Sequence, residues 1–177
     1  MSPTGQESPC PDEVSAYAQQ TVTYVKTALD VELSYDSETL PVLDHYLRSV
    51  SDQPALVELT ATTAGAYFGE VVRRRIGGRW DLSTGDPSTW RIVLNTGLSF
   101  APAGVAAEAI AQKEQTHLPS NFDAPAKLRP HLEAALSRMG ELTVEEYYSL
   151  CGRFDTLEHL QEVLMAVAAQ LAAQQKN

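Results

Sequence analysis

The sequence has little of the chemistry that stabilises secreted proteins or anchors membrane proteins. Its two cysteines, Cys10 and Cys151, are too few for a disulfide framework. It has no run of about 18 apolar residues, so no segment is predicted to span a bilayer. The N-terminus is polar and lacks the charged start and apolar stretch of a secretory signal. We therefore expect a cytoplasmic protein, with residues 1–11 as a disordered leader and residues 12–177 as one domain.

Familiar metal, nucleotide and phosphate motifs are also missing. The four histidines, His45, His117, His131 and His159, do not pair with another histidine, cysteine or carboxylate at a metal-ligand spacing. The glycine patterns that cradle phosphates, G-x-x-x-x-G-K-S/T and G-x-G-x-x-G, do not occur. We therefore expect no metal and no cofactor, and whether the chain is an enzyme stays open.

One segment comes close to a nucleophile motif. Residues 97–101, Gly-Leu-Ser-Phe-Ala, differ from G-x-S-x-G only in the last position, and Asp123 and His131 follow Ser99 in the order of a hydrolase triad. That motif belongs to large parallel sheets built from alternating strands and helices. The chain lacks this alternation, so we do not expect a hydrolase.

Charge is unevenly distributed along a chain of ordinary globular composition. Hydrophobic residues make up 44% and charged residues 20%, and the formal net charge is −10. Residues 61–100 contain five arginines and three acids, whereas the segments on either side are acidic. An acidic surface repels the phosphates of nucleic acids and anionic membranes, so we expect neither as a partner.

Apolar periodicity predicts an α+β fold. Spacings of three and four predict helices, and short β-branched runs bounded by turns predict strands. The predicted helices are 12–29, 37–50, 55–76, 102–112, 126–139, 143–150 and 157–173. The predicted strands are 79–82, 90–94 and 98–100, an antiparallel meander, with 31–35 left open as a fourth strand.

The helix predicted at 55–76 contains two glycines, Gly65 and Gly69, on one face. Each glycine costs a helix interior about 1 kcal/mol, so the pair indicates that another element approaches the backbone closely. We therefore expect this helix at the centre of the molecule. It should pack on a small three- to four-stranded antiparallel sheet, followed by a mostly helical C-terminal half.

Arginines at the end of this helix form the main candidate site. Glu70 precedes Arg74 by four residues, the spacing of a helical ion pair, which favours a structural role. The alternative is recognition of an anionic ligand or an acidic partner, because arginine suits bidentate contacts with carboxylate and phosphate. The full set of candidate residues is Glu70, Arg73, Arg74, Arg79, Trp80, Trp90 and Arg91.

The last predicted helix carries a seam of apolar residues at alternating steps of three and four. The seam consists of Leu157, Leu160, Leu164, Val167 and Leu171, a little over two heptads. It indicates either packing on the domain core or a self-association surface. Three or four heptads are normally needed to predict a coiled coil, so both interpretations stay open.

Two motifs carry a resemblance to a known group of proteins. Residues 65–70, Gly-Ala-Tyr-Phe-Gly-Glu, precede Gly-Gly-Arg-Trp at 77–80, and this order resembles a group of small uncharacterised bacterial domains. Those domains share a G-A-Y/F-x-G-E helix followed by a G-G-x-W strand start. Residues 35–40 and 43–47 fit their second helix, so the resemblance covers about residues 31–100. It implies a fold and no reaction.

These observations favour a bacterial, non-enzymatic protein-interaction module that binds another protein or itself as a homodimer. Two alternatives stay open. The first is a small-molecule or anion-binding domain that uses Arg73, Arg74 and Arg79. The second is an immunity-type inhibitor whose acidic surface covers a basic toxin.

Overall fold

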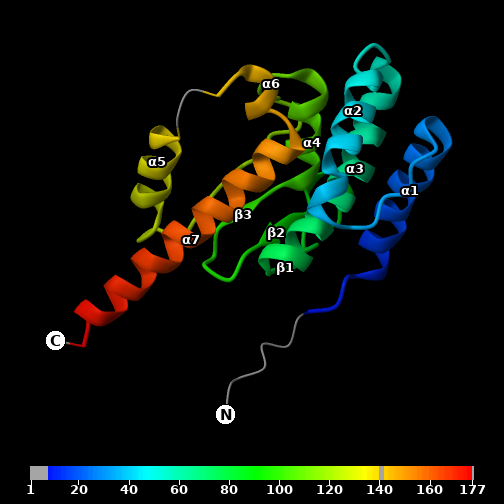
Figure 1. Cartoon of the computed structure of the whole chain (residues 1–177). Helices are drawn as coiled ribbons and strands as arrows, with labels where there is room; N and C mark the ends of the chain where they lie inside the picture. The colour runs from blue at the N-terminus through cyan, green and yellow to red at the C-terminus, as the bar shows by residue number, and fades with distance from the viewer. Residues whose placement is uncertain (1–7, 140–141, 177) are drawn as a thin grey trace.

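The computed structural model describes residues 8–139 and 142–176, so residues 1–7 of the predicted leader lie outside it. The described residues form an α+β fold with a three-stranded sheet (Figure 1). The helices are α1 (Asp12–Leu29), α2 (Leu40–Val50), α3 (Pro54–Ile76), α4 (Pro102–Ala111), α5 (Arg129–Arg138), α6 (Val144–Tyr147) and α7 (Leu150–Gln174). The strands are β1 (Arg79–Asp81), β2 (Arg91–Val93) and β3 (Ser99–Phe100), and 3-10 turns occupy η1 (Ser37–Thr39) and η2 (Pro87–Thr89).

Helices α3 and α4 form the centre of the molecule. Residues 60–72 of α3 and residues 102–110 of α4 are buried without interruption, so these parts of the two helices are covered on all sides. The most extensive contacts of α3 are with α4 and α1, and α2 and α7 also pack on α4 (Figure 1). The prediction that the glycine-containing helix is central is confirmed.

The two glycines of α3 permit two different close approaches. A Cβ atom at Gly65 would lie 2.5 Å from the Cα atom of Ala103, so α3 and α4 meet there almost backbone to backbone. A Cβ atom at Gly69 would overlap the indole ring of Trp80 on β1. The close approach that the sequence predicts is therefore confirmed: helix α4 lies against Gly65, and strand β1 lies against Gly69.

The sheet is an antiparallel meander in the order β1-β2-β3, as predicted. Ile92 is its central residue, opposite Trp80 on one side and Phe100 on the other. Phe100 also contacts Phe68 of α3 edge to face, with ring centroids 6.2 Å apart. The sheet thus packs one face on the central helix through aromatic side chains.

The segment 31–35 does not join the sheet, so the fourth strand left open by the sequence is absent from the described residues. Tyr35 adopts a left-handed backbone conformation, with φ at 59°. Its backbone N–H donates to the Tyr67 hydroxyl at 2.9 Å, and the two rings contact each other at a tilt of 33°, with centroids 4.7 Å apart. A side chain of α3 thus takes the place of a neighbouring strand.

Three helix starts differ from the prediction by three residues or more. Helix α2 begins at Leu40 rather than at 37, because residues 37–39 form the 3-10 turn η1. Helix α7 begins at Leu150 rather than at 157, because Ser149 accepts a hydrogen bond from the backbone N–H of Gly152 and so caps the helix earlier. Helix α5 begins at Arg129 rather than at 126, which places Pro130 in its first turn, where a missing N–H costs nothing. The predicted capping box of Thr143 and Glu146 is present at the start of α6.

Within the described ranges, no helix combines the length and the apolar character needed to cross a membrane.

Candidate functional site

Glu70 is the centre of the candidate site, and its buried carboxylate accepts four hydrogen bonds. Arg73 donates twice, at 2.9 and 2.7 Å, in a bidentate pair. Arg74 donates from Nε at 2.8 Å, and the indole N–H of Trp80 donates at 3.2 Å. We call Glu70, Arg73, Arg74 and Trp80 the Glu70 cluster. It joins the end of α3 to strand β1.

The number of donors determines the charge state of Glu70. Burial alone would raise the pKa of this carboxyl, because a charged group loses its hydration. The hydrogen bonds from Arg73, Arg74 and Trp80 outweigh burial and lower the pKa from 4.5 to about 2. Glu70 is therefore ionised throughout the neutral range and offsets one of the two positive charges of Arg73 and Arg74.

The N-terminal segment and Tyr35 cover part of the outer side of the Glu70 cluster. The guanidinium of Arg73 donates to the backbone oxygen of Ser8 at 2.8 Å. The guanidinium of Arg74 lies over the Tyr35 ring, 4.3 Å from its centroid. Burial and the nearby charge of Glu70 raise the pKa of the Cys10 thiol to about 11, so this thiol is not a nucleophile at neutral pH.

The other three candidate residues lie elsewhere. Arg79 is exposed on β1, and strand alternation turns it away from the face of Trp80. Trp90 is buried against Tyr17 of α1, with ring centroids 5.4 Å apart. Arg91 donates to the Ser99 hydroxyl at 2.8 Å and to the backbone oxygen of Asn121 at 2.7 Å. The structure therefore does not bring the seven predicted residues together as one site.

The contact of Arg91 also bears on the nucleophile motif. The Ser99 hydroxyl receives its hydrogen bond from a guanidinium, which cannot serve as a general base. Asp123 pairs with Arg129 at 3.1 Å, and the backbones of Ser99 and Asp123 bridge to each other. The residues of the motif thus stabilise the edge of the sheet.

Sequence reasoning missed a second buried ion pair, between Glu108 of α4 and Arg153 of α7. Their side chains are each 5% exposed and lie 3.1 Å apart. The guanidinium of Arg153 also lies over the Tyr147 ring at 4.1 Å, and Ser120 donates to Glu108 at 2.9 Å. Burial raises the pKa of Glu108, and the attraction of Arg153 does not offset it. We call these two residues the Glu108 pair.

Asp44 of α2 is a third buried carboxylate that the sequence did not reveal. It accepts hydrogen bonds from the backbone N–H groups of Leu150 (2.7 Å) and Cys151 (3.1 Å) at the start of α7. The positive end of the helix dipole and two unpaired N–H groups suit a carboxylate there. Burial and a hydrogen bond to Asp44 raise the pKa of the Cys151 thiol to about 12. This thiol is therefore also unreactive.

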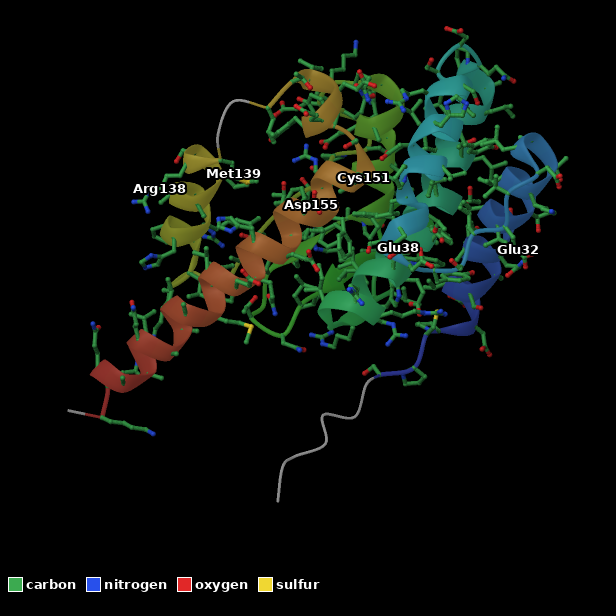
Figure 2. The ribbon with its side chains drawn as sticks, in the orientation of Figure 1. Glu32, Glu38, Arg138, Met139, Cys151 and Asp155 are labelled. Carbon is green, nitrogen blue, oxygen red and sulfur yellow. The ribbon has the colours of Figure 1, made fainter. Side chains whose placement is uncertain are left out.

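A cleft of about 290 Å³ lies between η1, the end of α3 and α7. Three carboxylates line it, those of Glu38, Asp155 and Glu158, together with Arg75. Glu38, Cys151 and Asp155 are labelled in Figure 2, where Glu38 lies near the first turns of α7. Among the described residues none of these three carboxylates forms a salt bridge. The cleft therefore contains three carboxylates and one guanidinium that form no salt bridge among the described residues.

The seam of α7 divides into a buried and a half-exposed part. Leu157, Leu160 and Leu164 are fully buried in the core, so this part packs within the chain and is not a self-association surface. Val167 and Leu171 are half-buried. The core below α7 ends at this point, and the last turns of α7 extend beyond the sheet (Figure 1).

We call residues 163–176 the arm. No charged side chain occurs from 163 to 175, and Met165 is 57% exposed. Beside the arm lies a groove of about 470 Å³, lined mainly by apolar residues. Its lining residues are Pro125, Ala126, Lys127, Leu128, Ala168, Leu171, Ala172 and Gln175.

In the described ranges no group of three or more histidine, cysteine, aspartate or glutamate side chains is arranged to hold a metal ion. Comparison of the chain with models of protein families, with curated proteins and with solved structures found no match. The resemblance to small bacterial domains therefore stays a prediction.

Proposed function

We propose that the protein is a non-enzymatic interaction module that binds another protein with its arm. The observation that carries the proposal is the uncharged sequence of residues 163–175, on a helix with Met165 more than half exposed. A helix that is apolar on several sides is normally covered by other protein. An exposed apolar surface of this kind marks an interaction site.

The groove beside the arm supports the same function. It continues the apolar surface from Ala172 on the arm to Pro125 and Leu128, where the chain enters α5. A partner side chain placed in this groove would lose contact with water on several sides. Buried apolar anchors of this kind supply much of the binding energy of protein interfaces.

The ionisable groups of the core favour an interaction module over an enzyme. The carboxylates of Glu70, Glu108 and Asp44 each hold two elements of the fold together. The thiols of Cys10 and Cys151 have raised pKa values and are protonated at neutral pH. Groups engaged in this way serve stability, because catalytic groups need free lone pairs and pKa values near the working pH.

Capture from a native lysate tests this function. The immobilised wild-type chain should retain a partner, and the Ala169→Glu variant should lose it, because Ala169 is exposed in the middle of the arm. Gln174→Glu adds the same charge about 140° away around the helix and should retain the partner. Equal retention by all three chains would contradict a role for the arm, as would retention by none of them together with a wild type that does not self-associate.

The acidic cleft supports a second candidate function, the binding of a basic protein as an immunity-type inhibitor does. Its unpaired carboxylates could accept hydrogen bonds from a lysine or arginine of a partner. A lysine-rich peptide should then bind to the wild-type chain. Asp155→Asn with Glu158→Gln should weaken this binding much more than Glu133→Gln, an exposed control on α5. An equal loss in both variants would indicate general attraction to an acidic chain.

A further inference from the structure

The residues on the face of the arm opposite the seam are arranged symmetrically along the helix. Seven residues of α7 and its C-terminal end share this face, and all of them are exposed. They are Glu162, Met165, Ala166, Ala169, Ala172, Ala173 and Lys176. We call them the arm face. Counted from Ala169, each member has a counterpart at the same distance in the other direction.

We propose that the arm binds a second copy of this chain, with the two arms antiparallel and the two-fold axis at Ala169. This inference rests on the proposed function and names its partner. An isologous interface requires that one surface be complementary to itself. Rotation about Ala169 brings Met165 opposite Ala173 and Ala166 opposite Ala172. The bulky Met165 therefore packs against an alanine, and the other pair consists of two alanines.

Charge distinguishes the antiparallel arrangement from the parallel one. Glu162 and Lys176 lie at equal distances from Ala169, so Glu162 of each copy meets Lys176 of the other. In a parallel pair, Glu162 would face Glu162 and Lys176 would face Lys176. The antiparallel pair also places the remainders of the two acidic chains at opposite ends, because the arm extends away from them (Figure 1).

The small size of the arm face favours a weak dimer. From Glu162 to Lys176 the face is about 21 Å long, at 1.5 Å per residue. Alanines allow the two helix backbones to approach closely, as small residues do where helices cross. Such a contact is smaller than the roughly 800 Å² per partner of a standard interface. We therefore expect a reversible dimer with a dissociation constant in the micromolar range.

Sedimentation equilibrium of the full chain from micromolar to millimolar concentration tests the dimer. The wild type should pass from one to two chains per particle as concentration rises. Ala169→Glu should remain monomeric, because it brings two carboxylates together at the axis, and Gln174→Glu should behave as the wild type does. A wild type that stays monomeric, or a dimer that persists in Ala169→Glu, would overturn the proposal.

A charge exchange tests the antiparallel geometry. Glu162→Lys alone and Lys176→Glu alone should each weaken the dimer about tenfold, because each change makes two like-charge contacts. The double variant restores both pairs and should dimerise as the wild type does. A double variant at least as weak as the two single ones would overturn the antiparallel pairing. Circular dichroism of each variant shows whether it is folded.

The failure of this inference can be separated from the failure of the proposed function. If the wild type is monomeric but a different protein is captured from the lysate and lost in Ala169→Glu, the arm is an interaction site and the second copy is not its partner. If Ala169→Glu changes neither association nor capture, both ideas fail together.

Discussion

The Glu70 cluster and the Glu108 pair each bury a glutamate carboxyl beside arginine, but they differ in how the carboxyl is hydrogen-bonded. Both place a glutamate that is at most 5% exposed on a central helix, and both supply arginine. Glu70 accepts four hydrogen bonds and its pKa falls to about 2. Glu108 accepts two, from Ser120 and Arg153, and its pKa rises.

Glu70 has both more hydrogen-bond donors and more guanidiniums around it than Glu108, and both differences favour the charged form of its carboxyl. Each hydrogen bond to the charged form offsets part of the hydration lost on burial. Glu70 also keeps Arg74, whose side chain is 48% exposed, so part of the cluster remains in contact with water. The Glu108 pair has almost no contact with water, because both of its side chains are only 5% exposed.

The largest expected effect comes from removing Arg153, which leaves Glu108 buried without its cation. Arg153→Met should lower the free energy of unfolding by about 3–5 kcal/mol, the usual cost of breaking a buried ion pair. Urea denaturation at neutral pH measures it. Arg75→Met, an exposed arginine on α3, is the control and should change stability by less than about 0.5 kcal/mol. A loss no larger than that of the control would contradict the comparison.

Removing the charge of Glu70 should have a smaller effect. Glu70→Gln keeps the shape of the side chain but loses charge-assisted hydrogen bonds, so we expect a loss of about 2 kcal/mol. The loss should be smaller than for Arg153→Met, because water can hydrate the half-exposed Arg74. The same urea experiment measures it. A larger loss of stability in Glu70→Gln than in Arg153→Met would mean that the exposure of the arginine does not determine which loss is greater.

The dependence of stability on pH should have opposite signs at the two sites. Because the folded pKa of Glu70 is lowered from 4.5 to about 2, its contribution is present above about 4.5 and lost as the pH falls toward 2. Because the folded pKa of Glu108 is raised, the folded chain binds that proton first, and acidification toward 4.5 favours folding. Unfolding of the wild type, Glu70→Gln and Glu108→Gln across the acid range measures both. Differences of the same sign would contradict this assignment.

The smallest expected effect comes from removing one donor of the four. Trp80→Phe deletes the indole N–H that bonds to Glu70 and should cost about 1 kcal/mol. The pKa of Glu70, followed by NMR, should rise at the same time. Trp90→Phe is the matched control, because the indole nitrogen of Trp90 has no partner among the described residues. An unchanged pKa of Glu70 in Trp80→Phe would show that the fourth donor is dispensable.

The sequence predicts one of these sites and not the other because of chain distance. Glu70 and Arg74 are four residues apart on one helix, so their spacing alone predicts a contact, which the structure confirms at 2.8 Å. Glu108 and Arg153 are 45 residues apart and meet only through the packing of α4 on α7. The one available signal was Glu108 itself, a single acid in an otherwise apolar helix.

The fold was predictable where the signal was local. The glycines of α3 and the turn residues of the meander predict the central helix and the three strands. The start of α7 has one local signal, the N-cap Ser149, but its second support was not predictable, because Asp44 lies more than a hundred positions earlier. A lack of local signal also explains why three seam leucines could not be assigned to the core from the sequence.

The attachment of α7 at one end has a mechanical consequence. Asp44 and the Glu108 pair hold its first turn to α2 and α4, while the other end extends past the sheet. A helix that is fixed at its base and loaded at its tip transmits torque as a lever does. A load applied near residue 170 would therefore first reach the buried leucines of the seam and Gln161, which accepts a hydrogen bond from Thr96 in the turn between β2 and β3. The contacts of Asp44 and Glu108 at the base of the helix would bear the load last.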